Sequence, residues 1–266
     1  MGTLLQGLLK TYRIKVILSH NKLVRSIQFL NHLLLIAGIT FVFYTDRYEL
    51  LLLSLITYWS IGVLGINIGF HRLLSHRSFK TYKFIEYFLS IVGIITTVGS
   101  SLAWVAIHRQ HHRKTETRED PHSPYYIGNL KAWFGFWSIR QLDVKLIRDI
   151  KSSKFHRFLH RKYFLIIFLW CCLLALLDPM YIVFVYAIPA CLCLHSTSAI
   201  IVIAHRHGYK TYELKQDESR NSWIANIITL GEGWHNNHHA KPYQWSNWER
   251  WWEWDIPSLF IRLIKK

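Results

Sequence analysis

Two pairs of long apolar segments dominate the pattern of hydrophobic and polar positions along the chain. The first pair covers residues 27–44 and 50–70, and the second covers residues 163–177 and 180–204, with a break at Asp178-Pro179. A proline after an acidic residue favours a turn, and a helix needs roughly 20 apolar residues to cross a bilayer. The pattern predicts an all-α membrane protein with four transmembrane helices in two hairpins, built as a single integral-membrane domain over residues 1–266.

The basic residues indicate how these hairpins are oriented. The chain carries 32 Lys and Arg against 16 Asp and Glu, and Arg47 alone among the basic residues falls within the two hairpins. The positive-inside rule therefore places the N-terminal arm, residues 71–162 and the tail after His205 in the cytoplasm, with both termini. Because the basic residues alternate with apolar runs, we expect no nucleic-acid partner and expect an anionic membrane surface.

Three histidine clusters carry the candidate chemistry. His108, His111 and His112 have offsets of three and four residues, and His235, His238 and His239 repeat them, while His71 and His76 form a third pair. On a helix these offsets put the imidazoles of one cluster on one face, within reach of one point. Two copies of the same spacing predict a shared metal site.

Residues 84–103 form a further apolar segment between the first two clusters. A full span there would place the clusters on opposite sides of the membrane. The segment contains Gly93, Gly99 and several Ser and Thr residues, and it carries Glu86 near its start. Since irregular backbone at membrane depth is tolerated where protein buries it, we expect a re-entrant or interfacial helix covering the site.

Imidazole suits Fe, Zn, Cu and Ni, so the type of donor does not choose the metal. Eight clustered histidines exceed the needs of one four-coordinate ion and suit two adjacent ions with open positions. Supplied with dioxygen and electrons, such a centre could attack an unactivated C–H bond. Its place at the membrane face suggests a lipid-chain substrate.

The three clusters, with Asp120-Pro121-His122-Ser123-Pro124 after the second and Gly231-Glu232-Gly233-Trp234 before the third, resemble membrane fatty acid desaturases. The resemblance is to the Δ9 branch that includes stearoyl-CoA desaturase and bacterial relatives, over about residues 66–256. It implies four spans, a cytoplasmic helical cap with a histidine-ligated di-iron centre, and a buried acyl channel. The implied reaction introduces a cis double bond at Δ9 of a saturated acyl chain, using O2 and two external electrons.

The resemblance also implies residue roles. The expected iron ligands are His71, His76, His108, His111, His112, His205, His235, His238 and His239. Asp120 and His122 are candidates to support the ligands from behind. Trp59, twelve residues before His71 and thus about 18 Å deeper along a helix, is the candidate end of the acyl channel. The remaining histidines, among them His32 and His195, are assigned structural or interfacial roles.

The chain departs from the family pattern in two ways. Ile201 stands where relatives have an asparagine that holds a metal-bound water, and an aliphatic side chain cannot make that hydrogen bond. Either Ser198 or a water compensates, or the outcome of the reaction is altered. Ala106 and Ile107 replace a charged Arg-Asp pair that helps to bind CoA in animal enzymes, which leaves acyl-CoA, acyl-lipid and acyl-carrier protein as possible substrates.

Two other functions stay open from the residues. The same centre could serve a di-iron hydroxylase or other lipid oxygenase, and a membrane metal-binding protein without enzymatic activity is a third reading. For an oxidase, electrons must come from a separate donor such as ferredoxin or cytochrome b5, for which a basic surface is suited. The short N-terminal arm favours a bacterial inner membrane.

Overall fold

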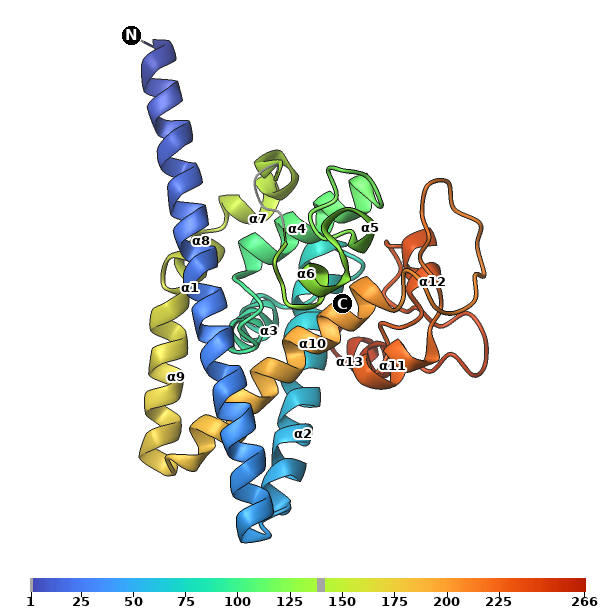
Figure 1. Cartoon of the computed structure of the whole chain (residues 1–266). Helices are drawn as coiled ribbons and strands as arrows, with labels where there is room; N and C mark the ends of the chain where they lie inside the picture. The colour runs from blue at the N-terminus through green and yellow to red at the C-terminus, as the bar shows by residue number, and fades with distance from the viewer. Residues whose placement is uncertain (1, 138–141) are drawn as a thin grey trace.

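The computed structural model describes residues 2–137 and 142–266, with side chains from residue 22 onward, and this part of the chain is helical (Figure 1). The helices are α1 (Gly2–Thr45), α2 (Glu49–Ile61), the π-helix η1 (Gly62–Ser75), α3 (Lys83–Ile95), α4 (Ser101–Lys114), α5 (Pro124–Ile127), α6 (Asn129–Trp133), the 3₁₀-helix η2 (Val144–Ile147), α7 (Arg148–Ser152), α8 (Lys154–Arg161), α9 (Tyr163–Leu177), the π-helix η3 (Ile182–Ala187), α10 (Ile188–Val202), α11 (Trp223–Thr229), α12 (His235–Ala240) and α13 (Ile256–Ile264). The described residues contain isolated β-bridges but no β-strand.

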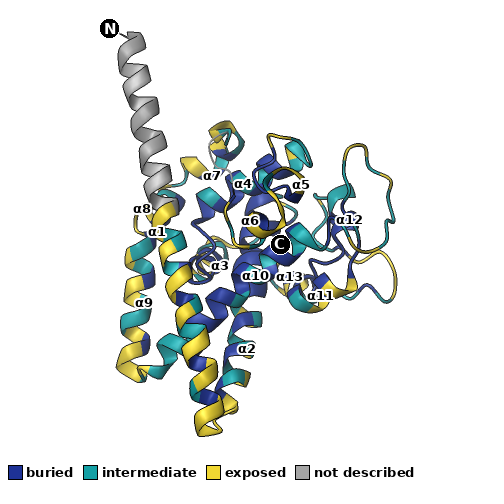
Figure 2. Cartoon of the chain, in the orientation of Figure 1, coloured by how far each residue is buried: buried dark blue, intermediate teal, exposed yellow. Residues whose placement is uncertain are grey.

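Three helical segments are long and apolar enough to cross a membrane: Lys22–Thr45, Glu49–Ser75 and Ile182–Val202. The fourth segment expected from the sequence, α9, has 15 residues and reaches the required length together with α8, from which it is bent by 69°. The structure thus confirms a helical chain with three to four candidate membrane spans. Its outer surface fits a membrane, because many large apolar side chains of these helices are exposed (Figure 2).

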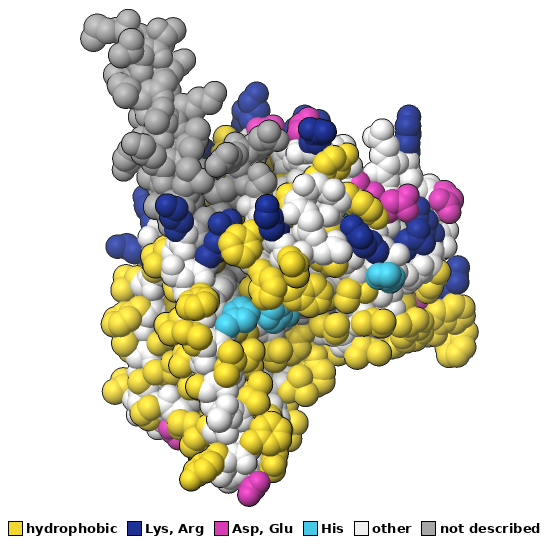
Figure 3. Space-filling model, viewed as in Figure 1, with side chains coloured by type: hydrophobic (Ala, Val, Ile, Leu, Met, Phe, Trp, Pro, Cys, Tyr) yellow, Lys and Arg dark blue, Asp and Glu magenta, His cyan; other side chains and the backbone are white. Residues whose placement is uncertain are grey.

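The first long helix, α1, runs opposite in direction to α2 with η1 and to α10, and α10 packs against both α1 and α2. The ends at Lys22, Ser75 and Val202 consequently lie on one side of the bundle, where the shorter helices gather (Figure 1). Figure 3 shows apolar side chains covering the long helices and most of the visible Lys and Arg side chains on the side of the shorter helices. This distribution separates a membrane-facing part from a polar part.

The apolar segment 84–103 is two helices. α3 ends at Ile95, the backbone turns at Thr97 with φ +56°, and Ser100 begins α4 by accepting a hydrogen bond from Ala103 N. α3 lies directly against η1: a Cβ added at Gly93 would approach the Phe70 ring to 2.5 Å. Its other face is apolar and exposed, and the re-entrant or interfacial role of the segment remains a prediction.

Candidate metal centre

The nine histidines expected as ligands come together in two adjacent groups. One group contains five residues, His71, His76, His108, His112 and His238, and the other contains four, His111, His205, His235 and His239. Within each group the nearest ligand atoms all lie within 4.8 Å of one another. We call them the five-histidine and four-histidine groups.

The two clusters of three histidines each contribute to both groups, which corrects the expectation that one cluster surrounds one point. His108 and His112 lie in the five-histidine group with ring centroids 4.6 Å apart, whereas His111 belongs to the four-histidine group and its ring is 6.3 Å from that of His108. Successive residues of an α-helix point about 100° apart, so His111 and His112 diverge. His238 and His239 divide between the groups in the same way.

The pair His71 and His76 depends on the unusual winding of η1. Five residues of an α-helix turn by about 500°, which would leave these side chains about 140° apart. A π-helix closes its hydrogen bonds from residue i to i+5, and His76 N donates to His71 O at 3.1 Å. The wider turn brings the two rings to 4.9 Å between centroids.

The ring nitrogens have the geometry expected around metal ions. Nε2 atoms face one another at 3.0 Å for His71 and His238, 3.0 Å for His238 and His112, and 3.1 Å for His235 and His205. Two nitrogens bound at right angles with metal–nitrogen bonds of about 2.1 Å lie about 3.0 Å apart. In addition, Nε2 of His111 and of His239 is buried without a hydrogen-bond partner, so the residues present fit two metal ions.

Carboxylates hold the opposite ring nitrogen of four ligands. The Nδ1 atoms of His71, His111, His205 and His239 lie 2.8, 2.9, 3.0 and 2.6 Å from oxygens of Glu232, Asp120, Glu116 and Asp217. A carboxylate at Nδ1 fixes the tautomer with hydrogen on Nδ1 and leaves the Nε2 lone pair free for a metal. Of these acids the sequence singled out Asp120 for such a role; Glu232 was visible as part of the Gly-Glu-Gly-Trp motif, and Glu116 and Asp217 carried no signal.

Electrostatics act differently on different ligands. Burial alone would lower the pKa of His111, but the carboxylate of Asp120 outweighs that effect and raises the pKa. Burial, followed by repulsion from neighbouring imidazoles, holds the pKa of His108, His112 and His238 well below the ordinary value, so these rings are neutral at pH 7. Burial alone would raise the pKa of Glu232, but the charges of Arg72 and His71 outweigh it and lower that pKa to about 2. The carboxylate therefore stays ionised.

The buried Arg72 connects the carboxylate of Glu232, which lies behind His71, to the rest of the fold. The Arg72 guanidinium, 1% exposed, donates to Glu232 Oε1 and to Asp255 Oδ2, and it also donates to the Trp245 carbonyl. It thereby ties η1, which carries His71, to the chain around α11, α12 and α13. Buried charges are tolerated where they are paired and hydrogen-bonded in this way.

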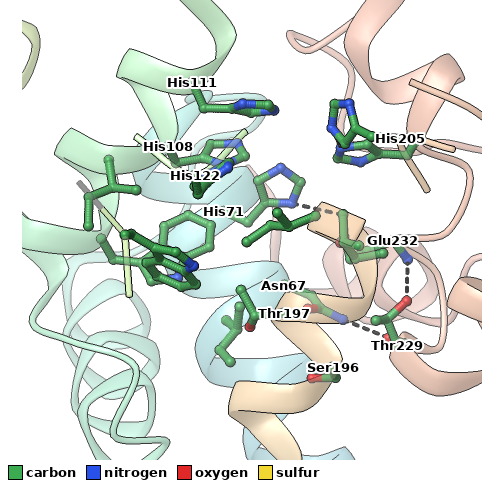
Figure 4. A pocket seen from close by; sticks show the side chains of 17 residues that line it. Asn67, His71, His108, His111, His122, Ser196, Thr197, His205, Thr229 and Glu232 are labelled. Carbon is green, nitrogen blue, oxygen red and sulfur yellow. Dashed lines mark hydrogen bonds and ion pairs between the residues drawn. The ribbon is translucent and has the colours of Figure 1, made fainter. Parts of the chain in front are cut away.

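A cavity of about 70 Å³ opens beside both groups (Figure 4). His71, His108, His111, His205 and His235 reach it from one end, and Asn67, Ser196, Thr197 and Thr229 line the other. The lining is largely apolar. Such a cavity can hold an aliphatic segment beside the metal ligands while excluding bulk water.

The structure also locates the residues that departed from the family pattern. Ile201 is 5% exposed, lines the cavity with His205 and His235, and packs in a cluster with Ala132 and Trp137. The Ser198 hydroxyl donates to the Trp133 carbonyl at 2.6 Å, and Ser198 is not among the residues that line the cavity.

The two remaining candidates lie at different distances from the ligands. His122 lines the cavity with its ring 4.4 Å from that of His111, and its Nδ1 is 3.6 Å from Asp120 Oδ1. Trp59 is outside the lining of this cavity and packs at the edge of the main hydrophobic core. Its role as the end of a channel remains a prediction.

Comparison with known proteins agrees with this centre. Residues 49–258 match the family described as fatty acid desaturase. An sn-1 stearoyl-lipid 9-desaturase of Anabaena variabilis is 36% identical over 80% of this chain and 79% of its own length. An sn-2 palmitoyl-lipid 9-desaturase of Nostoc sp. is 34% identical over 78% and 75%, and an acyl-CoA 5-desaturase of Anemone leveillei is 33% identical over 88% and 76%.

A membrane-associated helical fold with paired histidine groups defines a class of metal-dependent membrane oxidoreductases. The chain belongs to the fatty acid desaturase family, and it is an enzyme of that family acting on acyl chains. This excludes the reading as a metal-binding protein without enzymatic activity.

Proposed function

We propose that the protein is a di-iron acyl-lipid desaturase that introduces a cis double bond at Δ9 of a saturated chain. The observation that carries the proposal is the division of nine histidines into groups of five and four, with four Nδ1 atoms held by carboxylates. The position of the double bond is taken from the relatives named 9-desaturases. The lipid carrier rests on the same names and on Ala106 and Ile107 in place of a CoA-binding charged pair.

Each part of the site has a distinct task in this proposal. All nine histidines would hold two iron ions, which when bound supply the oxidising chemistry with O2 and two external electrons. Glu116, Asp120, Asp217 and Glu232 keep hydrogen on Nδ1, so that the Nε2 atoms stay directed inward. The apolar lining positions the aliphatic chain and keeps water from the reacting carbon atoms.

The surroundings of the enzyme follow from charge and apolarity. We infer four membrane spans in an inner bacterial membrane, with the short helices and both termini in the cytoplasm. The net charge of +16 suits both anionic lipid headgroups and an acidic electron donor such as ferredoxin or cytochrome b5.

A second outcome of the same chemistry is hydroxylation. Ile201 favours it as a candidate, because an aliphatic side chain lines the cavity beside the four-histidine group where relatives place an amide. The ratio of unsaturated to hydroxylated product made by the Ile201→Asn variant tests this alternative.

Expression with fatty-acid and metal analysis tests the proposal. We expect two irons per chain and new Δ9 double bonds in membrane lipids. His111→Ala and His238→Ala each remove one ligand from a different group and should abolish the product and lower bound iron. His207→Ala, a change at a histidine outside both groups, is the matched control. Unchanged iron and product in both ligand variants would contradict the proposed site.

A further inference from the structure

A second, larger cavity adjoins the metal centre and opens among the membrane-facing helices. Its volume is about 410 Å³, within the usual range of ligand pockets. Its walls come from α1, the connection between α3 and α4, α4 itself, residues 134–137 and α10. We call it the side chamber.

The side chamber and the metal-site cavity share two lining residues, Ile107 and Trp137. These two side chains therefore stand between the chamber and the histidine groups. The metal-site cavity, at about 70 Å³, is much smaller than the side chamber. An acyl chain that reaches the metals thus needs additional space, and the chamber supplies apolar space directly beside it.

The rim of the side chamber is exposed and aromatic. Phe29, Phe134 and Phe136 are 66%, 44% and 50% exposed, and they belong to the chamber lining. Figure 3 shows this face of the molecule as a continuous apolar surface that includes partly exposed histidine side chains. The chamber therefore faces lipid where the long helices cross the membrane.

Along α1 the chamber wall is polar. Arg25, Gln28 and His32 have offsets of three and seven residues, which puts them on one helix face. The Arg25 guanidinium lies 4.8 Å from the Phe136 ring centroid, and no carboxylate among the described residues pairs with it. Gln28 is 6% exposed, and its Oε1 has no hydrogen-bond partner. Unpaired polar groups in a membrane span indicate a functional site.

Both ring nitrogens of His32 on this face already have hydrogen-bond partners. His32 Nδ1 donates to the Gln28 carbonyl at 2.6 Å, so its Nε2 accepts from His195 Nε2 at 3.1 Å. The free positive charge at the chamber is accordingly that of Arg25. A phosphate complements this guanidinium.

We propose that the side chamber is a lateral entrance through which one acyl chain of an anionic glycerophospholipid reaches the metal centre from the membrane. Arg25 binds the phosphate, and the acyl chain passes between Ile107 and Trp137. The assignment rests on the proposed desaturase function and names its substrate and route. It also explains why Ala106 and Ile107 replace the charged pair that helps to bind CoA, since the substrate arrives from the bilayer.

Lipid crosslinking tests the route without requiring turnover. The purified full-length protein is reconstituted in bilayers that contain phosphatidylglycerol with a diazirine on its acyl chain. We expect crosslinks to residues 24–32 and 134–137. Ala103→Phe, which fills the chamber, should lower these crosslinks about tenfold, while Ser26→Phe on the exposed face of α1 should not. Crosslinking that is unaffected by Ala103→Phe in a folded protein would overturn the assignment.

Rates on three substrates separate this assignment from the proposed function. Distearoyl phosphatidylglycerol, distearoyl phosphatidylcholine and stearoyl-CoA are compared at equal chain length. One cation near an anionic surface contributes about fivefold in binding, so Arg25→Glu should lower kcat/KM for phosphatidylglycerol at least about tenfold. Lys22→Glu is the same charge reversal at an exposed position of α1. It should lower kcat/KM for phosphatidylglycerol by less than about threefold.

The outcomes are distinct. A selective loss with phosphatidylglycerol supports the entrance, and equal effects of Arg25→Glu and Lys22→Glu overturn the role of Arg25. Desaturation of stearoyl-CoA but not of either bilayer lipid would overturn the route while leaving desaturation intact. An absence of O2-dependent double bonds from all three substrates would instead refute the proposed function, with the crosslinks still reporting on lipid in the chamber.

Discussion

The carboxylate behind His239 offers a selective way to weaken one of the two proposed metal sites. Asp217 Oδ2 lies 2.6 Å from His239 Nδ1, and its Oδ1 accepts from Ser219 N at 2.8 Å. In Asp217→Asn the amide can keep its oxygen on Ser219 N, which turns its NH2 group toward His239 Nδ1. An NH2 group there favours the tautomer with hydrogen on Nε2, the nitrogen that must be free for the metal.

Loss of such a carboxylate typically lowers metal affinity 10- to 100-fold, equivalent to about 1.4 to 2.7 kcal/mol. Asp217 has no hydrogen bond to any member of the five-histidine group. We therefore expect one iron to become easier to remove while the other is held as in the wild type. Folding should be little changed, because the substitution is nearly isosteric and Asp217 is partly exposed.

Iron per chain, measured by mass spectrometry against rising chelator concentration, gives the two affinities. The variant should reach one iron per chain at a chelator concentration about 10- to 100-fold lower than the wild type requires. Glu249→Gln provides the control, since Glu249 pairs with Lys241 and contacts none of the nine histidines. A wild-type curve for Asp217→Asn, or simultaneous loss of both irons, would refute the assignment of His239 to a separate site.

Three further changes probe the cavity, the channel and the buried ion network. Ile201→Asn introduces an amide beside His205 and should change turnover or the ratio of unsaturated to hydroxylated product, measured by mass spectrometry of the lipids. Wild-type values for both would show that isoleucine at this position does not affect the reaction. Trp59→Ala should lengthen the preferred acyl chain at unchanged iron content, and an unshifted chain-length optimum counts against Trp59 as the channel end. Arg72→Met leaves Glu232 and Asp255 buried without their partner and should lower the free energy of unfolding by about 3 to 5 kcal/mol, seen as an earlier denaturation midpoint. Arg77→Met, at a side chain 61% exposed, should cost far less, and equal losses in the two variants would contradict the role of the network.

The sequence by itself determined the helical, membrane-associated class and pointed to the clustered histidines proposed as ligands, whereas His205 was added only by the family resemblance. Both rest on local regularities: a run of apolar residues is long enough to span a bilayer whatever its neighbours are, and a repeated offset of four residues aligns side chains on any α-helix. His108 and His112 do share a group for this reason, as do His235 and His239. Asp120 could be singled out because it follows the second cluster closely.

The tertiary structure decided how these parts combine. Helix geometry alone turns His111 away from His112, but the partners of His111 depend on where the segment after α10 places His205 and where α12 places His239. The meeting of His71 with His76 depends on π-helical winding of η1 against α3. Asp217, Glu116 and the side chamber carry no periodic signal, because they are brought to the site by loops and by helices distant in sequence. Hydrophobic periodicity records which face of one element is buried, whereas the partners across an interface depend on how whole elements pack.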